Sequence, residues 1–213
     1  MTDFGAAYRA QRELIPDPAG FKVALTNPAA QAAFGVEHPL YGGITADRIL
    51  ESPAELPLDG QTERFLELEV AILRDDAGRL TARAAFEVVE PKRARRHRLA
   101  TDVESFVADG SAFAWAVLGD PIEVPLEDLA GLRATLEVDG GVGATDSVSG
   151  GLDNVLGGPL VAYEWFLGEI ARYEGESAPA LVLTGSAIPM QRIEPGRTYR
   201  GTIQGASVSL EVS

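Results

Sequence analysis

The chain has no cysteine among its 213 residues and only two histidines, His38 and His97. Disulfides, cysteine nucleophiles and cysteine-ligated zinc are therefore excluded, and two histidines are too few for a histidine-rich metal centre. No Gly-x-Ser-x-Gly sequence occurs, so the sequence sign of one large class of serine hydrolases is missing. Carboxylates and lysines must carry most of any chemistry.

Positive charge is also scarce, with 18 lysines and arginines against 32 acidic residues and a net charge of −14. Phosphate binding needs a basic surface, so this balance argues against nucleic acid and against anionic membranes. The sequence has no apolar run long enough to cross a bilayer. Its first residues, Met1-Thr2-Asp3-Phe4, lack the charged-then-apolar pattern of a signal peptide. We therefore expect a cytoplasmic protein without nucleic-acid or membrane partners.

Short apolar segments rich in branched side chains predict a strand-dominated fold. A chain of this length can bury one substantial core. The clearest helix begins at Pro159, where apolar residues at helical spacing predict a core-facing stripe of Leu160, Tyr163, Leu167, Ile170 and Ala171. The fold class is therefore α+β, mainly β. We predict strands over 21–26, 64–74, 80–90, 112–118, 132–138, 180–185 and 198–212, and further helices over 5–14 and 28–34. We also predict a loop through 38–43 and a hairpin turn followed by a mobile loop over 140–151.

Three glutamates are the most informative feature. Side chains alternate along a strand, so Glu67 and Glu69 point the same way, roughly 6–7 Å apart at the backbone. Glu87, on the next predicted strand, would complete a cluster of three repelling charges. A hard divalent cation such as Mg²⁺ or Mn²⁺ would relieve that repulsion. The alternative is a solvated sheet face, which is the commoner meaning of Glu-x-Glu on a strand.

A basic run from Lys92 to Arg98 is unusual in so acidic a chain. A solvated loop or a salt-bridged surface is one interpretation. Anion binding by one of its residues is the other.

Several motifs in order resemble those of the fumarylacetoacetate hydrolase superfamily, in particular its 2-keto-4-pentenoate hydratase and 4-oxalocrotonate decarboxylase branch. The similarity spans most of the chain from about residue 20. The motifs are Phe21-Lys22-Val23-Ala24-Leu25-Thr26-Asn27-Pro28, Phe34-Gly35-Val36, Pro39-Leu40-Tyr41-Gly42, Glu67-Leu68-Glu69-Val70-Ala71, Ala85-Phe86-Glu87-Val88-Val89, Val107-Ala108-Asp109, Val155-Leu156-Gly157-Gly158-Pro159-Leu160 and Leu183-Thr184-Gly185-Ser186.

The resemblance implies a mixed β-sandwich roll with a few helices, in a single catalytic-type domain over residues 1–213 whose N-terminal segment, about 1–45, is reduced. It implies Mg²⁺ or Mn²⁺ held by Glu67, Glu69 and Glu87. The activity it implies is that of a lyase, a hydratase or a decarboxylase, acting on a 2-oxo acid or 2-hydroxydienoic acid through a metal-stabilised enolate. A homo-oligomer is also implied. The residues that the resemblance assigns are Lys22 for proton transfer or anion binding, and Thr184 or Ser186, together with Lys92, for substrate binding.

Some positions depart from the pattern of this branch. Leu40 stands where the hydratases have an acidic residue, and Gly110 where they have asparagine. These departures leave two alternatives open. One is a carbon–carbon bond hydrolase of acylpyruvate-like substrates, in which His38 beside Glu37 would activate water. The other is a degenerate member that binds small acids without turning them over.

Overall fold

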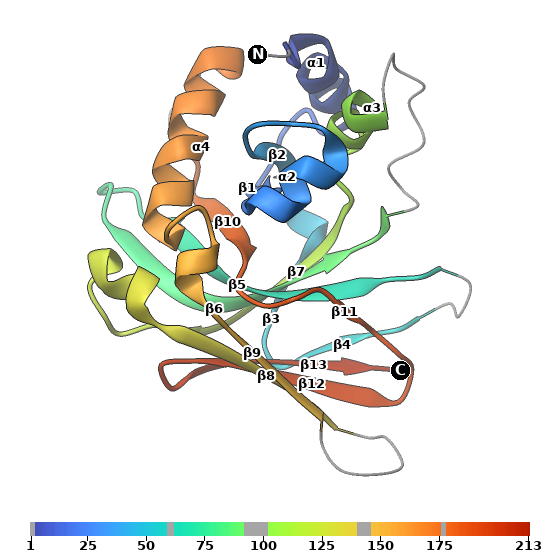
Figure 1. The fold of residues 1–213 in the computed structure, drawn as a ribbon, viewed down its shortest axis with the longest axis vertical. Coiled ribbons are helices and arrows are strands. Elements are labelled where there is room, and N and C mark those ends of the chain that lie inside the picture. Colours follow the sequence, from blue (N-terminus) through green and yellow to red (C-terminus); the bar gives the residue numbers. More distant parts are fainter. Residues whose placement is uncertain (1–2, 59–61, 92–101, 140–145, 176–177) are drawn as a thin grey trace.

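The computed structural model describes residues 3–58, 62–91, 102–139, 146–175 and 178–213. Helices gather at one end of the molecule and a five-stranded sheet lies at the other (Figure 1). No helix of the described part is long and apolar enough to cross a membrane. The helices are α1 (Gly5–Leu14), α2 (Pro28–Phe34), α3 (Asp102–Ala108) and α4 (Pro159–Glu174), with 3-10 turns at Ala46–Arg48, Leu126–Gly131 and Leu152–Asn154.

Strands fall into two sheets, in agreement with the predicted mainly-β class. The larger has the order β2-β1-β10-β5-β6-β7-β3, with β11 paired to β5, and the smaller has the order β4-β13-β12-β8-β9. Their bounds are β1 (Gly20–Ala24), β2 (Leu40–Ile44), β3 (Ile49–Glu51), β4 (Ala54–Leu56), β5 (Phe65–Arg74), β6 (Leu80–Val89), β7 (Phe113–Pro121), β8 (Arg133–Asp139), β9 (Asp146–Gly151), β10 (Leu181–Ser186), β11 (Gln191–Arg192), β12 (Arg197–Ile203) and β13 (Ala206–Val212).

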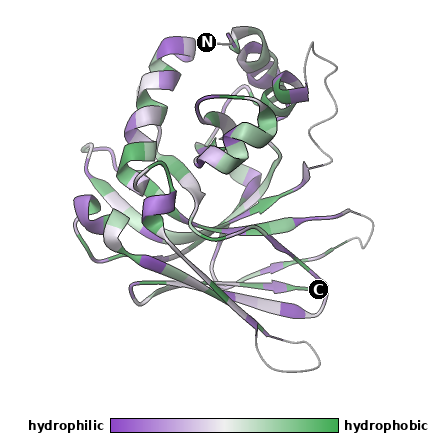
Figure 2. Ribbon diagram, in the orientation of Figure 1, coloured by the Kyte–Doolittle hydropathy of each residue, from purple (hydrophilic) through white to green (hydrophobic). Residues whose placement is uncertain are grey.

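The main core lies on the β5 face that carries Leu66, Leu68, Val70 and Ile72, all fully buried. The smaller sheet approaches this face closely: a Cβ on Gly201 would lie 2.5 Å from a Leu68 methyl and 2.9 Å from the Phe86 ring. Helix α4 adds aromatic side chains to the same core, and both hydrophobic and hydrophilic residues occur along it (Figure 2). One apolar face of β5 thus anchors both the second sheet and the longest helix.

The other face of the large sheet carries a smaller apolar cluster that draws on both ends of the strand order. Ile44 of β2 packs in this cluster with Ala116 and Leu118 of β7. The sheet therefore curls until its β2 end lies near β7. A Cβ on Gly42 would lie 2.3 Å from the Gly110 carbonyl oxygen, so this approach needs glycine. Glu67, Glu69 and Glu87 alternate onto this concave face.

Three predictions about local structure are wrong. The predicted loop through 38–43 overlaps β2, whose glycines serve the close approach described above. Part of the stretch 140–151, predicted as a hairpin turn and a loop, is strand β9, which pairs with β8. The predicted strand over 198–212 is two antiparallel strands, β12 and β13.

On α4 the predicted core stripe is largely confirmed: Tyr163 and Ile170 are buried, and Leu160 and Leu167 are partly buried against the same core. Ala171 is exposed, and the buried Ala162 and Phe166 were not part of the predicted stripe.

Candidate active site

The structure brings the three glutamates together. Glu67 and Glu87 face each other directly across the antiparallel pair β5–β6, and Glu69 follows two residues along β5. One carboxylate oxygen from each residue lies within 4.8 Å of the other two. Glu69 and Glu87 are fully buried and Glu67 is half-buried. The arrangement is therefore not the solvated sheet face that was the alternative.

Glu69 is oriented by the backbone of the neighbouring strand. The Gly185 N–H donates to Glu69 Oε2 at 2.8 Å. Gly185 has φ of 109°, and a Cβ there would lie 2.5 Å from Thr26, so the position requires glycine. Among the described residues nothing donates a hydrogen bond to Glu69 Oε1. One oxygen of Glu69 is thus held by the fold, while the other is free to bind a ligand.

Lys22 of β1 places an ammonium group against this cluster. Its Nζ lies 3.0 Å from Glu87 Oε1, and both side chains are almost completely buried. The two side chains form a buried ion pair at hydrogen-bonding distance. Three carboxylates and one ammonium leave two uncompensated negative charges in a buried site.

The pKa values of the buried groups reflect this excess of negative charge. Burial and the Glu87 charge raise the pKa of Glu67 to about 7, and burial with the same neighbour raises the pKa of Glu69 well above its usual value. Burial alone would lower the pKa of Lys22, but the carboxylates outweigh it and the pKa of Lys22 is raised. Without another cation, the cluster therefore holds extra protons near neutral pH.

The donor set fits a divalent metal ion. Buried carboxylate oxygens with unused lone pairs are the hard ligands that Mg²⁺ and Mn²⁺ prefer, and two surplus negative charges match one divalent cation. Glu67, Glu69 and Glu87 are the residues that would hold it.

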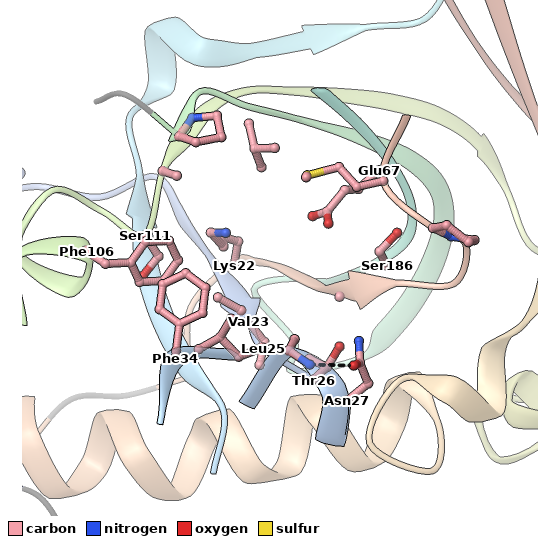
Figure 3. Close-up of a pocket in the computed structure, with 18 of the residues that line it drawn as sticks. Lys22, Val23, Leu25, Thr26, Asn27, Phe34, Glu67, Phe106, Ser111 and Ser186 are labelled. Carbon is pink, nitrogen blue, oxygen red and sulfur yellow. Dashed lines mark hydrogen bonds between the residues drawn. The ribbon is translucent and has the colours of Figure 1, made fainter. Parts of the chain in front are cut away.

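A cavity of about 910 Å³ is lined by Lys22 and, of the three glutamates, by Glu67. Lys22 stands near its middle, with Glu67 and Ser186 on one side and Phe34 and Phe106 on the other (Figure 3). The cavity therefore has a polar side next to the carboxylates and an aromatic side away from them.

The other predicted site residues are placed differently. Ser186 lines the cavity, and its hydroxyl donates to the Ile188 carbonyl. Thr184 is buried outside the lining, where its hydroxyl donates to the Val70 carbonyl at 2.9 Å. His38 also lies outside the lining, edge-on to Phe4. Lys92 lies outside the described residues.

Sequence reasoning missed the role of Gly185. The Thr-Gly-Ser stretch drew attention to its hydroxyls, whereas the peptide N–H of its glycine contacts the carboxylate. A glycine inside a strand often marks a bulge or a close backbone approach, and that signal was available. At Gly110 the backbone has φ of 78°, a conformation that both glycine and asparagine tolerate, so the departure from asparagine keeps the local backbone.

Comparison with known proteins identifies the family, although no protein-family model matches the chain. The chain is 32% identical over 203 residues to a 2-keto-4-pentenoate hydratase of Paraburkholderia phymatum, an alignment that covers 87% of this chain and 74% of the relative. A protein of the same name from Burkholderia vietnamiensis is 30% identical with the same coverage.

Solved structures share the fold. A 4-oxalocrotonate decarboxylase from Pseudomonas putida G7, complexed with magnesium and adipate, matches with a TM-score of 0.81 at 24% identity, over 100% of this chain and 87% of that one. A fumarylpyruvate hydrolase from Pseudomonas aeruginosa, in complex with Mn²⁺ and pyruvate, matches with a TM-score of 0.60 at 16% identity, over 91% and 88%.

The strand arrangement is therefore shared with these two enzymes. The chain belongs to the family of the 2-keto-4-pentenoate hydratases, within the fumarylacetoacetate hydrolase superfamily. The resemblance drawn from the motifs is confirmed.

Proposed function

We propose that the chain is a divalent-metal-dependent lyase, of hydratase or decarboxylase type, that acts on a 2-oxo acid or a 2-hydroxydienoic acid. The observation that carries this proposal is the cluster of Glu67, Glu69 and Glu87, with the Lys22 ammonium beside it, next to a large cavity that Glu67 and Lys22 line. Relatives named as hydratases, and related structures complexed with magnesium, calcium or manganese, support it.

A Mg²⁺ or Mn²⁺ ion, when bound, would polarise the 2-oxo group and lower the energy of the negative charge that develops on it. The protein's own part is to place Lys22 within reach of the carbon next to that group. A divalent cation on the glutamates would offset the negative charge that raises the pKa of Lys22. The amine, held beside Glu87 and shielded from bulk water, could then deliver or accept a proton at a defined position. Ser186, at the polar side of the cavity, is placed to contact the substrate head.

Proton exchange at C3 of a 2-oxo acid tests this proposal, because enolisation is common to the hydratase and decarboxylase reactions. In D₂O with Mg²⁺ or Mn²⁺, nuclear magnetic resonance should show that the wild type exchanges the pyruvate methyl protons. Lys22→Met and Glu69→Gln should each lower the exchange rate at least 100-fold. Glu55→Gln, which makes the same chemical change at an exposed glutamate on β4, is the matched control and should not change it. Equal rates in the wild type and Lys22→Met would contradict the assigned role of Lys22.

The hydrolase alternative has less support, because His38 does not line the cavity. Cleavage of an acylpyruvate by the wild type, lost in His38→Ala, would restore it. The predicted homo-oligomer is a separate question, which light scattering of the purified chain answers.

A further inference from the structure

The cavity is much larger than the head group that the carboxylate cluster would bind. Drug-sized ligands occupy pockets of about 300–1,000 Å³, and this cavity has about 910 Å³. A short 2-oxo acid held at Glu67 and Lys22 would leave most of that space to water. The far part of the cavity therefore has room for a bulky substituent on the substrate.

The wall opposite Glu67 carries two aromatic rings, with Ser111 beside Phe106 (Figure 3). The Phe34 and Phe106 rings, from α2 and α3, pack with their centroids 4.8 Å apart. Lys22 Nζ lies 6.0 Å from the Phe106 ring centroid, so a substrate held beside Lys22 has its next atoms against this aromatic pair. The same lining contains Leu25, Val89, Ile188 and Met190.

Phe34 and Met190 are unusually exposed for large hydrophobic residues, at 40% and 46%. Both line the cavity, so their exposed surface borders the space that a ligand would fill. A ligand that covered this surface would gain free energy from the removal of apolar area from water.

Charge on the described lining opposes a second carboxylate on the substrate. Its charged residues are Lys22, Glu67 and Asp102, and the ammonium of Lys22 is already paired with Glu87. Segment 92–101 lies outside the described residues, so this count covers the rest of the lining. A dicarboxylic acid would place its distal charge near Asp102 or against the aromatic pair, where desolvation is unfavourable.

Resting on the proposed function, we infer that the Phe34–Phe106 pair selects 2-oxo acids with a bulky, uncharged apolar substituent at the end distant from the carboxylate. Each methylene group that enters an apolar pocket changes the specificity constant by about 10-fold or more, so a phenyl group should be strongly preferred to hydrogen.

Isothermal titration of the Mg²⁺-loaded protein with pyruvate, 2-oxo-4-phenylbutanoate and 2-oxoadipate tests the inference. The phenyl acid should bind at least tenfold more tightly than the other two. Phe34→Ala should weaken binding of the phenyl acid about tenfold and change pyruvate binding less than twofold. The control is Leu14→Ala, which truncates an equally exposed residue outside the cavity and should change neither.

Tighter binding of 2-oxoadipate, or an equal effect of Phe34→Ala on all three acids, would overturn the inference. The C3 exchange assay separates it from the proposed function. If pyruvate exchanges but the phenyl acid binds no better, the selectivity is wrong and the lyase proposal stands. If the phenyl acid binds in a Phe34-dependent way but no acid exchanges, the lyase proposal is wrong and the tail site stands.

Discussion

Replacing Glu69 by glutamine should stabilise the metal-free protein and weaken the stabilisation that added metal gives. Two unit charges 4.8 Å apart repel by about 3.5 kcal/mol at an effective dielectric constant of 20. Lys22 and bound protons relieve part of that repulsion, so Glu69→Gln should stabilise the metal-free chain by roughly 2 kcal/mol. Glutamine keeps an oxygen that can accept the hydrogen bond from the Gly185 N–H, so this backbone group keeps its partner and no new cavity forms.

Bound metal should stabilise the wild type more than it stabilises Glu69→Gln. A ligand at 100 times its Kd that binds only the folded state adds about 2.7 kcal/mol, which raises the melting temperature of a chain of this size by about 5–11 °C. That rise should occur in the wild type. In Glu69→Gln it should fall below about 2 °C at the same Mg²⁺ or Mn²⁺ concentration, because one of three ligands and one of the surplus charges are lost.

Calorimetric melts of the metal-stripped protein, with and without either ion, measure both effects. Glu55→Gln controls for the change in net charge. The reasoning fails if Glu69→Gln destabilises the stripped protein, or if it keeps the full metal-dependent rise. The first result would mean that the cluster is not under repulsion, and the second that the ion binds elsewhere.

Three further predictions concern the same site and its support. The folded pKa of Glu67, about 7, lies above the roughly 4.3 of an unfolded chain, so the folded metal-free chain holds extra protons between these values. Its free energy of unfolding should therefore fall as pH rises through about 7 and then level off, a slope that Glu67→Gln flattens in melts across pH. Gly185→Ala forces a Cβ against Thr26 at positive φ and should cost at least about 2 kcal/mol in urea unfolding. Gln11→Met should cost about 1–3 kcal/mol, because the Gln11 amide bridges the Gly43 N–H and the Val107 carbonyl in a buried position; a loss below about 0.5 kcal/mol would contradict this bridge.

The part of the site that the sequence could predict follows from alternation along strands. Glu67 and Glu69 share a face of the strand whatever the rest of the chain does, and the residues that alternate with them must then enter the core. The direct pairing of Glu67 with Glu87 depends on the register of β5 and β6. That register becomes fixed only when the apolar face of both strands meets the second sheet.

Where a segment is apolar on several sides, sequence alone does not decide which side is buried. Helix α4 carries apolar residues on much of its circumference, so the predicted stripe missed the buried Ala162 and Phe166 and included Ala171, which is exposed. Which of the apolar residues are fully buried depends on the large sheet, whose position the helix sequence does not contain. Strand β2 is a second example. Its glycines weaken the sequence signal for a strand, but Gly42 allows the close approach to Gly110, which lies 68 residues later in the chain.

The aromatic wall of the cavity could not be predicted from the sequence, because its two rings come from short helices that are far apart in the chain. Phe34 ends a helix of seven residues, none of them buried, and Phe106 lies on another of seven that the sequence pattern did not predict. Neither ring belongs to a periodic stripe, and the two are 72 positions apart. They meet because α2 leads into β2, α3 leads into β7, and the curled sheet brings β2 near β7. Local sequence patterns could therefore identify the chemical groups of the site, whereas the selectivity that we infer depends on contacts that exist only after the sheet has closed.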